Sequence, residues 1–192
     1  MAKTDGRLAR GQERRELLLD SSVAVVAAGG AGALTHRAVA AQAGVSLASV
    51  TYHFPQIGDL RSGMFDHAGT RVGSAFRALV ETSDPGDVAK LAADYAVLLV
   101  RDQRDDTVAV FEMIVAATHD PTLRPLVRFF NDRLADLLVG AVGDRFSALV
   151  VASAIQGLIL GYCTQEQETD FPALHEAVSD LVARYSTTAK DN

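Results

Sequence analysis

Residues 34–54 read LTHRAVAAQAGVSLASVTYHF, and this stretch predicts two short helices joined by a tight turn. Thr35 and Ser46 can each cap a helix, because a hydroxyl oxygen accepts a hydrogen bond from an unpaired amide of the first helical turn. Gly44 lies where the chain must reverse, and glycine reaches a positive φ without a Cβ clash. The stretch therefore predicts a helix-turn-helix.

The second helix of this unit has a face suited to DNA. Apolar side chains of the two helices can share one core if the helices cross steeply, namely Val39, Ala40, Val45, Val50 and Phe54. A helix of eight residues is about 12 Å long, which matches the major groove, and its short hydroxyl and methyl groups can read base edges. A tyrosine and a histidine at the helix end suit phosphate oxygens. The candidate DNA-binding residues are Thr35, Arg37, Ser46, Leu47, Ala48, Ser49, Thr51, Tyr52 and His53.

The segment from Arg14 to Leu60 resembles the DNA-binding domain of TetR-type transcriptional regulators. It has an amphipathic first helix, a glycine-rich link, the run LTHRAVAAQAGVS, an HF pair and a short loop into a fourth helix. Alanine-rich helix pairs joined by glycine also occur in other helical proteins, and the resemblance is what favours DNA binding. It implies a homodimer that binds an inverted-repeat operator on double-stranded DNA, with a small-molecule effector bound farther along the chain.

Two positions depart from the family pattern. Thr51 stands where the family usually has a tyrosine, and Ile57 stands where a lysine usually opens the fourth helix and contacts phosphate. Tyr52 and His53 are the candidates to replace part of that phosphate contact.

Composition restricts where DNA can bind. The chain of 192 residues is 48% hydrophobic and carries a net charge of −6, which argues against indiscriminate binding to polyphosphate. Residues 1–60 hold six basic and five acidic side chains, whereas residues 61–192 hold twelve and nineteen. We therefore expect DNA contacts at the N-terminal end, where the basic residues are Lys3, Arg7, Arg10, Arg14, Arg15 and Arg37.

The helical pattern continues along the whole chain and predicts an all-α fold. We expect a polar arm over residues 1–12, a first helix over 12–28, a fourth over 59–79 and a linker at 83–86. Further helices are predicted over 87–101, 105–118, 121–142, 144–165 and 171–185. The predicted domains are a DNA-binding unit, residues 1–58, and an effector-binding and dimerisation bundle, residues 59–192.

The segment 146–165 contains no charge and is long enough to span a bilayer. A helix that is apolar all round can equally be buried in a soluble bundle, and Gln156 in mid-span favours this reading. The resemblance implies that this helix and the following one pair with their copies in a second chain. The candidate dimer-interface residues are Ser153, Gly157, Leu158, Gly161, Leu174, Val178 and Leu181.

The middle of the chain offers apolar and polar side chains for an effector pocket, a role that rests mainly on the resemblance. The candidates are His67, Tyr95, Leu98, Phe111, Met113, His119, Phe129 and Gln156. Ordinary core packing is the alternative for each of them, because pockets and cores use the same residue types.

Catalysis is not expected. The five histidines are scattered, no metal-spaced Cys/His cluster or GxSxG elbow occurs, and no catalytic residue, metal or cofactor is predicted. The lone Cys163 is expected to be a buried small hydrophobe, and the N-terminus lacks a charged-then-apolar leader, so we expect a cytoplasmic protein. The sequence favours a DNA-binding repressor relieved by an effector. A membrane-tethered DNA-binding protein and a non-catalytic helical adaptor are the alternatives.

Overall fold

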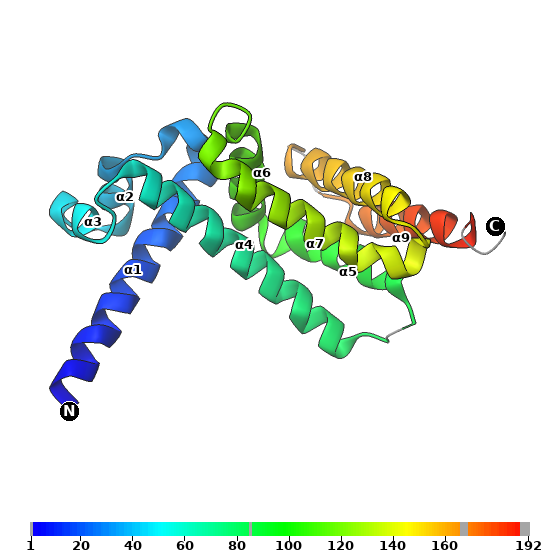
Figure 1. The fold of residues 1–192 in the computed structure, drawn as a ribbon, viewed down its shortest axis with the longest axis horizontal. Coiled ribbons are helices and arrows are strands. Elements are labelled where there is room, and N and C mark those ends of the chain that lie inside the picture. Colours follow the sequence, from blue (N-terminus) through cyan, green and yellow to red (C-terminus); the bar gives the residue numbers. More distant parts are fainter. Residues whose placement is uncertain (1, 85, 166–168, 189–192) are drawn as a thin grey trace.

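The computed structural model describes residues 2–84, 86–165 and 169–188, with the backbone alone at 2–8, 129, 130, 133, 134, 187 and 188. Every regular element in these ranges is helical, which confirms the all-α prediction (Figure 1). The elements are α1 (Ala2–Gly29), η1 (Ala31–Ala33), α2 (His36–Ala43), α3 (Leu47–His53), α4 (Ile57–Thr82), α5 (Val88–Arg101), α6 (Arg104–Ala116), η2 (Pro121–Leu123), α7 (Arg124–Val142), α8 (Arg145–Cys163) and α9 (Phe171–Thr188).

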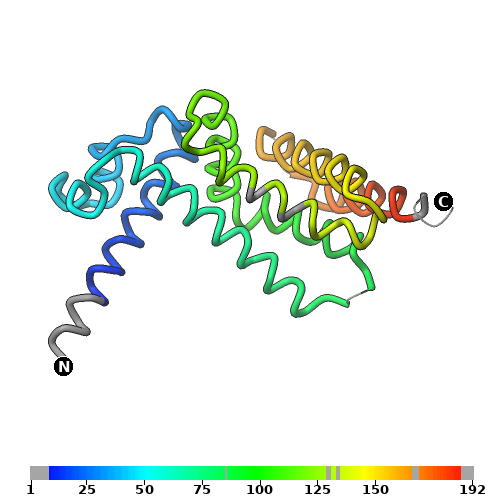
Figure 2. The backbone as a smooth tube through the Cα atoms, in the orientation of Figure 1, coloured from blue at the N-terminus to red at the C-terminus, as the bar shows by residue number. Residues whose placement is uncertain are grey.

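The helix-turn-helix lies at one end of an elongated molecule. Figure 2 follows the backbone from the cyan α2 and α3 at this end to the red α9 at the other. The long helix α4 begins beside α3 and runs along the bundle, so that it connects the two ends (Figure 1).

The predicted helix bounds hold to within a few residues except at the N-terminus. The linker falls between α4 and α5, as expected. The arm predicted over residues 1–12 is wrong, because α1 begins at Ala2. Residues 2–11 contain no proline and mostly good helix formers, so a helix that is fixed by packing farther along can propagate through them. The side chains of Lys3 and Arg7 lie outside the described residues.

One apolar core joins the helix-turn-helix to the middle of the chain. Fully buried side chains from α1, α2, α3, α4, α6 and η2 meet there, including Leu18, Val39, Val50, Leu60, Met64, Met113 and Leu123. This core contains side chains from both sides of residue 58, and within it α6 packs against α1, η1 and α4. The domain boundary at that residue stays a prediction.

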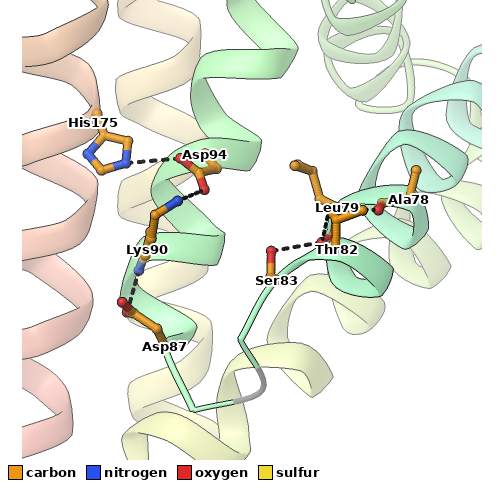
Figure 3. A network of polar contacts seen from close by, with 8 residues as sticks. All are labelled: Ala78, Leu79, Thr82, Ser83, Asp87, Lys90, Asp94 and His175. Carbon is orange, nitrogen blue, oxygen red and sulfur yellow. Dashed lines mark hydrogen bonds and ion pairs between the residues drawn. The ribbon is translucent and has the colours of Figure 1, made fainter.

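A second core holds the far end of the bundle. It joins α5, α7, α8 and α9, and Leu174 and Val178 of α9 are fully buried in it. Polar contacts fix α9 on α5 at its edge, where Asp94 pairs with His175 at 3.1 Å and with Lys90 (Figure 3). Figure 3 also shows how α4 ends, with the hydroxyls of Thr82 and Ser83 donating to carbonyls of the preceding turn.

Candidate functional site

The turn between α2 and α3 has the geometry expected from its residues. The Thr35 hydroxyl accepts from the amide of Ala38 at 3.1 Å, and the Ser46 hydroxyl accepts from the amide of Ser49 at 3.2 Å. Gly44 adopts a left-handed conformation with φ 64° and ψ 36°, which a residue with a Cβ rarely adopts. The two caps and this glycine fix the angle at which α3 leaves α2.

The outer face of α3 is free to meet a partner. Val50 is fully buried and anchors the helix, whereas Tyr52 is 81% exposed and Leu47 is 41% exposed. Of the nine candidate DNA-binding residues, seven are exposed and two, Ser49 and His53, are half-buried. Most candidates of α3 therefore lie at the surface, at the end of the molecule that holds the helix-turn-helix.

At the two positions that depart from the family pattern, the structure has a hydroxyl bonded within its own helix and an apolar side chain. The Thr51 hydroxyl donates within its own helix, to the carbonyls of Leu47 at 3.2 Å or Ala48 at 3.3 Å. Ile57 is an exposed apolar side chain at the start of α4. Tyr52 and His53, the candidates to replace part of the phosphate contact, lie edge to face with ring centroids 5.2 Å apart.

A cavity of about 700 Å³ lies in the bundle, and α4 forms one wall of it. Residues of α5, α6, α7 and α8 complete the lining. Phe65 and Val110 line the cavity and also belong to the core beneath the helix-turn-helix. The cavity and the DNA-binding end of the molecule therefore share packed side chains.

Three of the expected effector residues line this cavity: Tyr95, Phe111 and Gln156. Burial raises the pKa of the Tyr95 hydroxyl, so that group remains neutral. The other expected residues lie elsewhere: His67 pairs with Asp20, Leu98 packs in the second core, Met113 is fully buried in the first, and His119 is exposed. The side chain of Phe129 lies outside the described residues.

Sequence reasoning missed the wall formed by α4. Phe65, Gly69, Val72, Gly73 and Phe76 recur at helical spacing and all line the cavity. The pattern was available in the sequence, because two glycines one turn apart leave a gap on an otherwise apolar helix face.

Gly69→Ala is expected to raise the free energy of unfolding by about 0.5–1 kcal/mol, since glycine inside a helix costs that much relative to alanine. A Cβ at this position meets no atom within 4 Å, so no clash offsets the gain. The urea unfolding midpoint measures the change. A lower midpoint would mean that α4 needs a glycine there for its conformation.

A charged junction joins α1, α4 and α6 beside the cavity. Arg71 of α4 lies 2.9 Å from Asp20 of α1 and 2.9 Å from Asp106 of α6. Asp106 is almost fully buried, its Oδ1 atom has no partner, and burial raises the pKa of its carboxyl. Two further contacts tie the DNA-binding end to this part of the bundle, from Arg61 to Asp120 and from the Ala31 amide to Glu112.

The outer face of α8 is a continuous exposed stripe. Phe146, Val150, Ser153, Gly157 and Leu160 alternate at spacings of four and three, the period of a helix-packing seam, and all are exposed. Of the expected dimer residues, Gly157, Leu158, Gly161 and Leu181 line a shallow groove between α8 and α9. Leu174 and Val178 do not reach this surface, since they are buried within the chain.

The helix α8 also meets the length and hydropathy criteria for a membrane span, with a mean hydropathy of 1.8. Core helices of soluble proteins meet the same criteria. One side of α8 is buried, with Ala148, Val151, Ile155 and Ile159 in the second core. Cys163 at its end is buried as expected, and burial raises the pKa of its thiol.

Comparisons with known proteins agree with this architecture. Residues 18–62 match the profile of "Bacterial regulatory proteins, tetR family", and residues 83–185 match "Tetracyclin repressor-like, C-terminal domain". No curated protein sequence matches the chain.

Solved structures of several regulators resemble the chain. A TetR-family member from Streptomyces coelicolor A3 is 28% identical, with 88% of this chain and 98% of that one covered and a TM-score of 0.75. The multidrug binding protein EbrR, solved with ethidium, is 28% identical over 88% and 98% of the chains, with a TM-score of 0.68. A transcriptional regulator from Rhodococcus sp. Rha1 shares the fold, with 19% identity, 91% and 96% coverage and a TM-score of 0.77.

The two family profiles cover the helix-turn-helix and most of the bundle behind it, and together they match more than half of the chain. The protein is therefore a helix-turn-helix transcriptional regulator of the TetR family, not an enzyme.

Proposed function

We propose that this regulator is a homodimeric, cytoplasmic repressor whose operator binding is relieved by a small molecule in the α4 cavity. The observation that carries the proposal is the course of α4. Its first turns pack under the helix-turn-helix through Leu60 and Met64, and the same helix lines the cavity from Phe65 to Glu81. A ligand that moves this wall also moves the base of the DNA-binding unit.

The exposed face of α3 supports the DNA-binding part of the proposal. One short helix touches few base pairs, whereas two copies related by a two-fold axis read two half-sites about 34 Å apart. The operator is then an inverted repeat, read by the hydroxyls of Ser46 and Ser49 and by the side chain of Leu47.

The α8 stripe supports the homodimer. Its spacing suits packing against a second copy of the same helix, and Ser153 and Gly157 are small enough to allow close approach. One face of α8 is already buried in the second core, and a second chain would cover the exposed face. This arrangement favours a soluble dimer over a membrane tether.

Relief by an effector follows from reciprocal coupling. A ligand that binds better to the conformation unsuited to the operator lowers the affinity of the protein for DNA. Bound DNA then lowers the affinity for the ligand by the same factor. To shift the ratio of the two conformations from 1:99 to 99:1, the ligand must bind one conformation about 5.5 kcal/mol more favourably than the other. EbrR was solved with ethidium, malachite green and proflavin, and that precedent supports a ligand role for the cavity.

The test begins with selection of bound sequences from a random duplex pool at fixed, near-physiological salt, because phosphate contacts make affinity depend on salt. We expect an inverted repeat bound by two chains, as measured by the mass of the complex. The selected duplex then serves as the probe for a compound screen. If folded protein enriches no sequence, operator binding is rejected, and if no compound weakens the complex, effector relief is rejected.

Arg37→Gln is expected to reduce the salt dependence of operator binding. Each phosphate contact contributes about 0.9 to the slope of log K against log salt, so loss of one contact per half-site lowers the slope by about 2 per dimer. Arg101→Gln is the matched control, because Arg101 is exposed at the end of α5, outside the helix-turn-helix, and is paired with Asp102. Equal slopes for wild type and Arg37→Gln would remove Arg37 from the interface.

A further inference from the structure

We infer that the cavity selects an aromatic cation, an inference that rests on the proposed effector role of the cavity. Its inner lining is aromatic, with Phe76, Tyr95 and Phe111 on three different helices. Phe76 and Tyr95 pack edge to face with centroids 5.0 Å apart. Ring faces of this kind attract both flat ring systems and positive charge.

Two hydroxyls deeper in the cavity have already used their donors. The Tyr95 hydroxyl donates to the Val72 carbonyl at 3.2 Å, and the Thr107 hydroxyl donates to the Leu99 carbonyl at 3.1 Å. The Gln156 amide nitrogen donates one of its two N–H groups to Asn131 at 3.3 Å, and the Gln156 carbonyl oxygen is open to a ligand. These oxygens accept hydrogen bonds, so a ligand that donates N–H groups suits them better than an anion.

The charged side chains of the lining have the same preference. Asp66 and Glu81 lie on α4 at opposite ends of the lining, both are exposed, and neither forms an ion pair among the described residues. The third carboxylate of the lining, Asp136, is already paired with Arg145. Among the described lining residues Arg77 is the one cation, and it donates to Ser74 at 2.7 Å. Two unpaired carboxylates against one guanidinium favour a positively charged ligand.

The glycines of α4 leave room in the cavity for the ring system of a ligand. A Cβ at Gly69 meets nothing within 4 Å, and a Cβ at Gly73 meets only an Arg77 nitrogen at 3.9 Å. The α4 wall therefore has no side chain at two positions one helical turn apart, between Phe65 and Phe76. A leucine at either glycine would fill the cavity without touching the surface of α3.

Two dyes with one ring scaffold test the charge preference. Rhodamine 123 is a cation and fluorescein methyl ester is an anion, and both carry a xanthene ring and a methyl ester. Titration of the full-length protein without DNA, followed by fluorescence anisotropy at fixed salt, is expected to show at least tenfold tighter binding of rhodamine 123. The double variant Asp66→Asn/Glu81→Gln should bind rhodamine 123 about threefold to tenfold more weakly and fluorescein methyl ester no more weakly. The control Glu13→Gln/Glu16→Gln removes two exposed carboxylates from α1 and should change neither affinity.

Blocking variants separate this inference from the proposed function. Gly69→Leu should abolish rhodamine 123 binding while operator binding persists, and Gly73→Leu, one turn along, is the second blocker should the first not fold. Equal binding of the two dyes, unchanged binding by the double variant, or no binding of rhodamine 123 would each overturn the cationic preference. The effector role itself is judged separately, by whether any compound of a chemically mixed library releases the operator from wild type but not from the blocked variant.

Discussion

At neutral pH, Arg71→Ala is expected to lower the free energy of unfolding by about 2–3 kcal/mol, whereas Asp106→Asn should not lower it. The two side chains form one ion pair at 2.9 Å, but their surroundings differ, since Asp106 is 5% exposed and Arg71 is 48% exposed. Loss of one partner from a buried pair costs about 3–5 kcal/mol because the other charge stays buried alone. We expect a smaller loss of stability for Arg71→Ala because water reaches the Arg71 side chain.

The asymmetry comes from what each substitution leaves behind. Without Arg71, the Asp106 carboxylate loses its ion pair, and its Oδ1 atom already has no hydrogen-bond partner. Without the charge of Asp106, Arg71 still contacts Asp20 at 2.9 Å and remains half in solvent. The double variant Arg71→Ala/Asp106→Asn should therefore recover most of the stability that Arg71→Ala loses. Urea unfolding of the four proteins gives the coupling, and strictly additive losses would refute the account.

The pH dependence of the same variants provides a second check. Burial raises the pKa of Asp106 above its ordinary value of 3.8, so the folded state holds the proton more tightly than the unfolded state does. Such a group costs no stability at a pH below the unfolded pKa, and the cost grows as the pH rises through the folded value. The gain in the free energy of unfolding of Asp106→Asn over wild type should thus be greatest at neutral pH and should vanish below about pH 4.

The parts of the fold that sequence could predict depend on neighbouring residues. The caps at Thr35 and Ser46 and the reversal at Gly44 are each set within four residues, and all three are present. The charged junction was not predictable in this way, because Asp20, Arg71 and Asp106 lie on three helices whose packing decides whether they meet.

The residues that line the cavity could not be predicted from the sequence for the same reason. Tyr95 and Leu98 are three residues apart on α5 and both pack against the second core, yet of the two Tyr95 alone also lines the cavity. Residue type does not predict which side chain lines the cavity, since pockets and cores contain the same apolar side chains. Only the direction in which each side chain leaves its helix decides, and that depends on the neighbouring helices.

Leu160→Asp is expected to weaken the proposed dimer by more than 100-fold. Leu160 is 43% exposed within one chain and lies on the α8 stripe, so in a two-fold dimer the substitution places two carboxylates in the same apolar seam. Like charges desolvated together cost several kcal/mol, and each 1.4 kcal/mol is tenfold. Sedimentation velocity over a dilution series measures the dissociation.

The fold of the single chain should survive, because position 160 is at the surface of the second core and not within it. Unchanged far-UV circular dichroism is thus expected alongside the loss of the dimer. Val115→Asp is the matched control, since Val115 is 63% exposed on α6 and away from the α8 stripe. A monomer of Leu160→Asp presents one copy of α3, reads one half-site and loses most of its operator affinity. A dimer that persists in Leu160→Asp would instead place the two-fold axis on another face, and the half-site spacing would then be set by that face.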